Sequence, residues 1–106
     1  MSRAEDFVSV IWEARAKPGC EDDMRLFLKS AVTLSRNDPG CIDYEMHEVA
    51  DEAGVFIAYE RWVSRDALNK HLTAPRMSEM APRLLTLMQG SIEDGMRILH
   101  AIRPDS

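Results

Sequence analysis

The hydrophobic and polar positions of this chain follow two different spacings. Some segments are rich in β-branched and aromatic residues, with side chains alternating between two faces, which is typical of strands. Others place apolar residues three and four positions apart, as in a helix with one buried face. The predicted strands are 7–16, 41–49, 55–63 and 92–102, and the predicted helices are 20–37, 65–72 and 76–88.

Turn-forming and capping residues divide these segments. The run Asn37-Asp-Pro-Gly40 ends the first helix, because proline cannot continue it and glycine tolerates positive φ. Ser64 is a good N-cap for the next helix, and Pro75 suits the first turn of the third. The order βαββαβ, with the second helical region in two pieces, predicts an α+β ferredoxin-like fold with an antiparallel sheet. We expect one domain over residues 1–106, with its core over about 7–102.

The third predicted strand carries a charged residue among apolar ones. Alternation places Phe56, Ala58, Glu60 and Trp62 on one face of this strand. Burying a carboxylate between two aromatic rings costs several kcal/mol unless another group pairs with it. His71 is the nearest candidate partner in the sequence. The pair is therefore either a structural tether between strand and helix or an acid-base group, and the sequence leaves both open.

The first strand is apolar on both faces. Val8, Val10 and Trp12 share one side, whereas Phe7 and Ile11 share the other. Helices in this fold cover a single face of the sheet, so the second apolar face is expected to need a partner. The sequence predicts a homodimer in which two sheets pack face to face.

Composition and charge exclude several classes of function. The 106 residues carry thirteen Lys/Arg against eighteen Asp/Glu, a net charge of −5, with no dense basic run for nucleic acid. No apolar run approaches the ~18 residues of a membrane span, and residues 1–6 lack a signal-peptide pattern, so we expect a cytoplasmic protein. Cys20 and Cys41 flank the first helix, roughly 25 Å apart at about 1.5 Å per residue, which predicts free thiols. No cysteine or histidine spacing indicates a metal site.

Four motifs occur in order along the chain, and together they carry a resemblance to a known family. They are Lys17-Pro-Gly19, Ser35-Arg-Asn-Asp-Pro-Gly-Cys41 followed by Tyr44, Glu60-Arg-Trp-Val-Ser64, and Ala67-Leu-Asn-Lys-His71. In this order and at these separations, from about residue 7 to residue 100, the chain resembles the antibiotic biosynthesis monooxygenase family. No single motif is specific; the ordered set indicates the family more strongly than it indicates a substrate.

The resemblance implies a homodimeric α+β barrel with a pocket between sheet and helices in each subunit. Several relatives oxidise phenols, quinols or anthrones with O2 and no metal or flavin; others isomerise a phosphorylated sugar-derived signal, degrade haem, or have no known activity. Haem-degrading relatives use a histidine and an asparagine at positions that correspond approximately to Ala81 and Trp12 here. Neither residue type is present, which disfavours haem chemistry.

Oxygenation without a cofactor requires the substrate to supply electrons, and a phenol does so more readily once it has lost its proton. The site then needs an apolar slot, a base and hydrogen-bond donors. We expect His71 to be the base and Glu60 to orient it, with Tyr44 and Trp62 holding a small aromatic substrate beside O2. The further candidate substrate-binding residues are Phe56, Asn37, Met80, Arg83 and Leu84. No metal or other cofactor is expected.

Each candidate also has a structural alternative. Trp62, Phe56 and the methionine positions are compatible with ordinary core packing, and Tyr44 with a core residue whose hydroxyl is satisfied. Two other functions stay open on the same scaffold. A phosphosugar-type isomerase would need cations at its pocket, for which Arg61, Arg76 and Arg83 are candidates. A ligand-binding dimer without catalysis would need neither a base nor these arginines.

Overall fold

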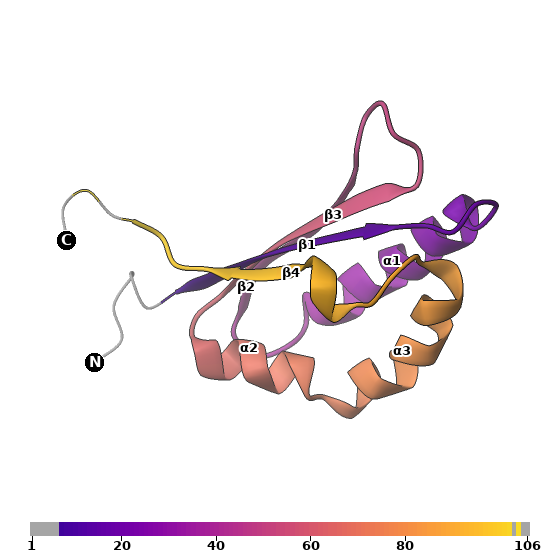
Figure 1. Cartoon of the computed structure of the whole chain (residues 1–106). Helices are drawn as coiled ribbons and strands as arrows, with labels where there is room; N and C mark the ends of the chain where they lie inside the picture. Colours follow the sequence, from indigo (N-terminus) through magenta and orange to yellow (C-terminus); the bar gives the residue numbers. More distant parts are fainter. Residues whose placement is uncertain (1–6, 103, 105–106) are drawn as a thin grey trace.

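The structure, a computed structural model, describes residues 7–102 and 104. The ends of the single domain predicted over residues 1–106 lie outside this description, as does part of the segment after residue 102. Figure 1 shows the described elements in chain order. They are β1 (Val8–Arg15), α1 (Glu21–Ser35), β2 (Cys41–Glu48), β3 (Val55–Trp62), α2 (Arg65–Leu72), α3 (Pro75–Leu87), the 3-10 helix η2 (Glu93–Gly95) and β4 (Met96–Leu99).

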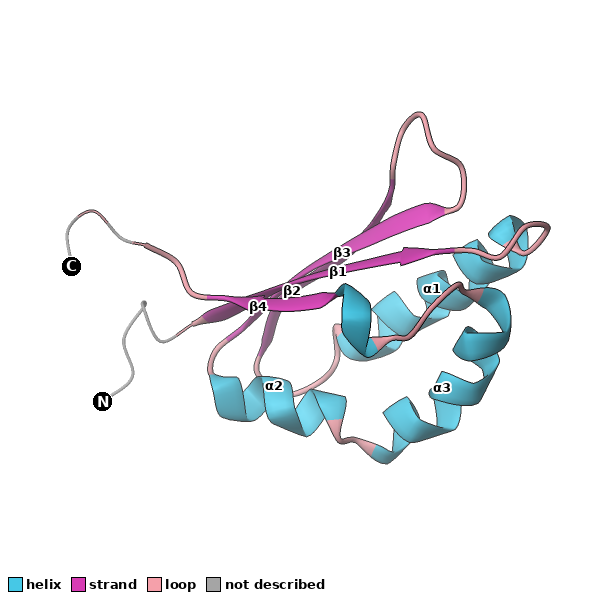
Figure 2. Ribbon diagram, viewed as in Figure 1, coloured by secondary structure: helices cyan, strands magenta, loops and turns pink. Residues whose placement is uncertain are grey.

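The described strands form one antiparallel sheet with the order β2-β3-β1-β4. This order and the chain direction confirm the predicted ferredoxin-like α+β fold. Figure 2 shows the three α-helices on the same side of the sheet. The hydrophobic core lies between these two layers. No helix in the described part of the chain is both long and apolar enough to cross a bilayer.

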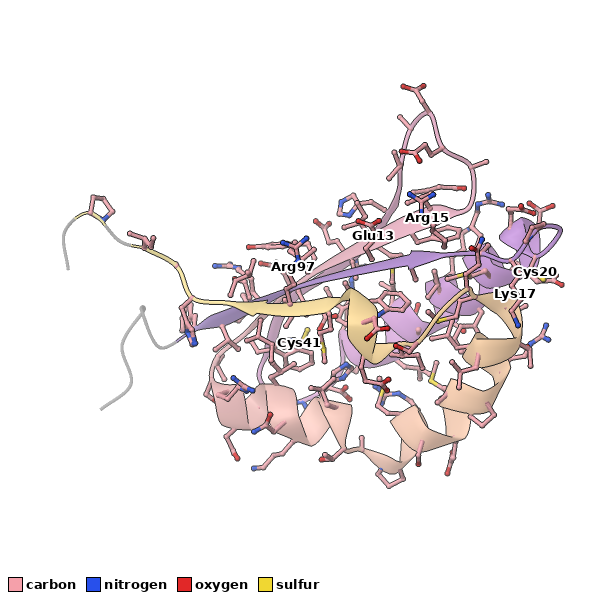
Figure 3. The ribbon with its side chains drawn as sticks, viewed as in Figure 1. Glu13, Arg15, Lys17, Cys20, Cys41 and Arg97 are labelled. Atoms are coloured by element: carbon pink, nitrogen blue, oxygen red, sulfur yellow. The ribbon has the colours of Figure 1, made fainter. Side chains whose placement is uncertain are left out.

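The alternation predicted for β1 and β3 is confirmed. The side chains of Val10 and Glu60, which are paired in the register, both lie on the helix-facing side and are buried. On the other side, Ile11 pairs with Tyr59, and both are partly exposed. Figure 3 shows Glu13, Arg15 and Arg97 extending from this second side, away from the helices. We call it the uncovered face; its apolar members include Ile11, Ile57, Tyr59 and Leu99.

Two turns at the same end of the sheet fix the position of α2. Gly40 has φ +84, and a Cβ added there would lie 2.6 Å from Cβ of Ala67, so only glycine lets α2 approach this closely. The backbone N–H of Val63 donates to the Gly40 carbonyl at 2.9 Å. Ser64 caps α2 as predicted, since its Oγ accepts from the Ala67 N–H at 3.1 Å.

The last strand is shorter than predicted. The expected range 92–102 is wrong at both ends, because residues 93–95 form η2 and β4 covers only Met96–Leu99. Ser91 Oγ accepts from the Asp94 N–H, which favours a turn over an extended strand. Gly95 lies so close to the Glu13 carbonyl that a Cβ there would overlap it.

Two helices also differ from the predictions at their ends. The first helix ends at Ser35 rather than at residue 37, and the side chain of Asn37 donates to the Thr33 carbonyl just past this end. The third begins at Pro75 and contains Pro82, which removes one backbone donor from its interior. The sequence pattern indicated no break at Pro82, because the residues around it keep the apolar stripe of a helix.

Candidate functional site

A small cavity of about 100 Å³ lies between the sheet and the helices. Its walls are mainly apolar and include Trp12, Phe27, Met46, Met77, Met80 and Leu84. Only three of its lining residues are ionisable: Tyr44 on β2, Glu60 on β3 and His71 on α2. An engineered cavity of about 150 Å³ in another protein holds benzene, so this smaller space admits one aromatic ring only if its flexible methionines move.

His71 is held by a carboxylate from a distant part of the chain. Its Nδ1 lies 2.7 Å from Oδ2 of Asp38, which belongs to the turn between α1 and β2. Arg76, at the start of α3, donates to both carboxylate oxygens of Asp38, at 3.1 and 2.8 Å. Asp38 therefore joins the α1–β2 turn to α2 and α3.

The charge state of this cluster follows from its surroundings. The hydrogen bonds from Arg76 lower the pKa of Asp38, and His71 adds to this effect against the cost of burial. Burial lowers the pKa of His71, although the Asp38 carboxylate opposes the shift. At neutral pH the imidazole is then neutral. Because ionised Asp38 can only accept, Nδ1 carries the proton and Nε2 keeps its lone pair.

Two aromatic rings fix the orientation of the imidazole. The Trp62 ring lies 4.6 Å from the His71 ring between centroids, tilted by 32°. Tyr44 approaches the same imidazole edge-on at 5.9 Å and 63°. The fully buried Trp62 also donates from Nε1 to Oε1 of Glu60 at 3.0 Å. Trp62 therefore supports both His71 and Glu60.

Glu60 and Tyr44 are direct partners on neighbouring strands and share an unusual environment. Burial raises the pKa of Glu60 to about 7, against the hydrogen bond from Trp62, which favours the carboxylate. Burial and the neighbouring Glu60 charge raise the pKa of Tyr44 well above its usual 10, so its hydroxyl keeps its proton. Tyr44, Glu60 and His71 form one polar end in an otherwise apolar cavity, and we call them the polar end.

The expected pairing of Glu60 with His71 is corrected by this geometry. His71 binds Asp38, and Glu60 binds Trp62. The prediction failed because sequence distance favoured the nearer carboxylate, whereas the turn at Asp38 meets α2 in space. Glu60 therefore does not orient His71, and it needs another explanation.

The other candidates divide into two groups. Tyr44, Met80 and Leu84 line the cavity with Glu60 and His71. Trp62 supports the polar end from the core without lining the cavity, and Phe56 is a buried core residue beside a separate groove between α1 and β2. Asn37 and Arg83 are exposed and outside the cavity lining.

Sequence reasoning missed Asp38 as a functional residue and treated it only as part of a turn. A signal was available, because Cys41 at the start of β2 pairs with Trp62 at the end of β3. The turn before β2 and the helix after β3 must therefore lie at the same end of the sheet. Arg76 was considered only as a phosphate ligand, and the buried Ser35 at the end of α1 was not considered for the cavity at all.

The arginines do not converge on the cavity. Arg61 bonds to Asp43 from the other side of the sheet, and Arg76 is bound to Asp38. Among the described residues that line the cavity, none is an arginine or a lysine. Both cysteines are free, as predicted. Within the described chain, no three histidine, cysteine or carboxylate side chains are grouped to hold a metal ion.

Comparison with known families places these features in context. A family model described as antibiotic biosynthesis monooxygenase matches residues 7–83. The chain is 34% identical over 68 residues to Rv0793 of Mycobacterium tuberculosis, whose name describes it provisionally as a monooxygenase, and 29% identical over 80 residues to sll1783 of Synechocystis, whose name gives no activity. These matches cover 64% and 76% of this chain. The chain spans only 66% and 54% of the lengths of these two relatives.

Solved structures share the fold. The structure of Rv0793 matches with a TM-score of 0.81 at 26% identity, covering 94% of this chain and 99% of that one. SnoaB, a cofactor-independent oxygenase from Streptomyces nogalater, matches with a TM-score of 0.79 at 15% identity, covering 92% of this chain and 95% of its own. At 15% identity, the likeness to SnoaB shows the fold alone.

Proposed function

Because this chain belongs to the antibiotic biosynthesis monooxygenase family, to whose model residues 7–83 match, we propose that it oxidises a small phenol, quinol or related aromatic compound with O2 and no cofactor. The observation that carries the proposal is the 2.7 Å contact between Nδ1 of His71 and the Asp38 carboxylate, which assigns the ring proton to Nδ1 and leaves Nε2 unprotonated. This nitrogen has no hydrogen-bond partner among the described residues, and His71 lines the apolar cavity. A neutral imidazole held by a carboxylate is suited to take a proton from a phenol.

The first step follows from these positions. A phenol in the cavity places its hydroxyl at the polar end and its ring against the apolar walls. Nε2 of His71 takes the hydroxyl proton, and the adjacent Asp38 carboxylate stabilises the imidazolium. Tyr44 keeps its proton and can donate a hydrogen bond to the developing anion. The phenolate then reduces O2 between the mainly apolar walls of the cavity.

Two alternatives on this scaffold are less well supported. A phosphosugar isomerase needs cations at its site, and the arginines considered for that role are bound elsewhere or exposed. A ligand-binding dimer without catalysis would use the same cavity but would not need an oriented base.

Oxygen uptake by metal-free protein tests the proposed function. We expect catalytic uptake with at least one compound from a panel of single-ring phenols, hydroquinones and naphthols, with weaker activity for wider ring systems because the cavity is small. Binding of panel compounds without any oxygen uptake would support the ligand-binding alternative. Neither binding nor uptake across the panel would contradict the proposal.

We also propose that two copies pair through the uncovered face. Leu99 on this face is 40% exposed, and Ile11, Ile57 and Tyr59 lie together at its centre. An apolar sheet surface of this kind is costly in water unless another surface covers it. Sedimentation of the wild-type chain as a 12.0 kDa monomer at micromolar concentration would contradict the pairing.

A further inference from the structure

Glu60 is a second cavity-facing group that the first proton transfer does not use. Its Oε1 accepts from Trp62, and its Oε2 has no hydrogen-bond partner among the described residues. Among the described residues, Arg76 Nε is the one fully enclosed side-chain nitrogen or oxygen without a hydrogen-bond partner. Oε2 of Glu60 is therefore not fully enclosed. Glu60 lines the cavity, and Oε2 is the oxygen that its bond to Trp62 leaves free to reach it.

The positions of Glu60 and His71 supply two proton-transfer groups from different elements. His71 reaches the cavity from α2, and Glu60 reaches it from the sheet. Both contact Trp62, His71 through its ring and Glu60 through the indole N–H. Both groups therefore lie at the same end of the cavity without bonding to each other, so one can be protonated while the other is not.

Oxidation of a phenol needs such a pair. After the phenol hydroxyl has lost its proton, the O2 that accepts electrons from the ring becomes an anion. In a mainly apolar cavity this anion needs a proton. Tyr44 holds its proton too tightly to give it up fully. A buried carboxylic acid with a pKa of about 7 still carries a proton over much of the neutral range and releases it readily.

We propose that Glu60 is the proton donor to reduced oxygen, acting opposite His71 as the base. The inference rests on the proposed phenol oxidation and adds a catalytic role for Glu60 in place of the orienting role that the structure rules out.

The proton and electron balance closes with these two groups. His71 takes the hydroxyl proton; an electron pair of the phenolate ring forms a carbon–oxygen bond to O2; and Glu60 protonates the outer oxygen, giving a ring hydroperoxide. The ionised Glu60 then removes the proton from the carbon that carries the peroxide. The O–O bond breaks, the leaving hydroxide takes the proton from His71, and quinone and water are released. Phenol and O2 have become quinone and water, and both side chains have returned to their starting states.

The other ionisable groups near Glu60 change their charge at pH values away from 7. On β2, burial raises the pKa of Cys41 above its usual 9, and the pKa of Tyr44 is raised above 10. On α2, the pKa of His71 is lowered below 6.5. In the turn between α1 and β2, the pKa of Asp38 is lowered below 3.8. A decline of activity as pH rises through about 7 is therefore specific to Glu60.

The test compares metal-free wild-type protein with Glu60→Gln and with Glu79→Gln, a matched change at an exposed position on α3. Glutamine keeps an oxygen for the Trp62 N–H but cannot give up a proton. Initial rates are measured with the fastest single-ring phenol from the uptake panel, across about pH 5 to pH 9, and anaerobic binding of the same phenol is titrated separately. The phenol should have an ordinary pKa near 10, so that its own ionisation does not shape the profile.

We expect Glu60→Gln to lower kcat by about 100-fold or more and to abolish the alkaline decline, with phenol binding and the Glu79→Gln profile unchanged. A Glu60→Gln rate close to that of the wild type, or the same alkaline decline in both, would overturn the role of Glu60 alone. If Glu60→Gln does not fold, the wild-type profile decides, and a rate that stays level through about pH 7 overturns the role. No oxygen uptake by the wild type with any compound would instead contradict the proposed function itself.

Discussion

Replacing His71 with glutamine is expected to lower oxygen-dependent turnover by ~10² to 10⁴-fold, the usual contribution of a positioned base. Glutamine retains a donor for the Asp38 carboxylate but presents no basic nitrogen to the cavity. Because the loss falls on proton transfer, kcat should decrease while anaerobic binding of the phenol changes little. The measurement is the initial rate of oxygen uptake beside a binding titration.

The control for this change is His100→Gln, which alters an exposed histidine outside the cavity lining. It should leave turnover and the association state of the chain unaltered. Full activity of His71→Gln against a confirmed substrate would show that His71 is not the base. Unfolding of both His71→Gln and His71→Ala, with His100→Gln intact, would favour the purely structural tether that the sequence left open.

Replacing Glu60 with glutamine is expected to raise the free energy of unfolding by about 3 kcal/mol at mildly alkaline pH. The pKa of the carboxyl is 4.5 when solvated and about 7 in the fold, so ionisation is harder in the native state. At about 1.4 kcal/mol for each pKa unit, this difference gives the stated free energy.

Because the pKa of Glu60 is raised in the fold, the free energy of unfolding of the wild type decreases as pH rises. Below pH 4.5 the carboxyl is protonated in both states, and the wild type has its full stability from this group. As pH rises through the folded pKa of about 7, that stability is lost, because the unfolded carboxylate is the better hydrated one. The free energy of unfolding is measured with urea at several pH values for the wild type, Glu60→Gln and Glu79→Gln. Parallel curves for wild type and Glu60→Gln at every pH would contradict the raised pKa.

Local patterns were sufficient to predict most of the fold. Alternation placed Phe56 and Glu60 on the buried side of β3, and Ser64 marked the start of α2 through its cap. These signals act over a few residues, so they can be recognised in one sequence. The last strand failed because Ser91 and Gly95 favour a tight turn against Glu13, and that contact joins residues far apart in the chain.

The candidate site was predicted only in part for the same reason. Glu60 was found because it interrupts the apolar face of a strand, His71 because it is the nearest candidate partner in the sequence, and Tyr44 because it follows one of the motifs that carry the family resemblance. Asp38 was missed because an aspartate before Pro39-Gly40 is ordinary turn chemistry, and its partners lie 33 and 38 positions away. Asn37 and Arg83 were included for their chemical type, but the helix end and the outer side of α3 turn them to solvent.

The protonation state of the His71 ring is the most direct test of the chemistry proposed for this cavity. Nitrogen-15 NMR of the imidazole rings, with His71 identified by its loss in His71→Gln, reports which nitrogen carries a proton. We expect a neutral ring at neutral pH, protonated at Nδ1 and unprotonated at Nε2, that titrates below 6.5. A ring that is doubly protonated at neutral pH, or protonated at Nε2 alone, would leave no base facing the cavity and would contradict the proposed oxidation.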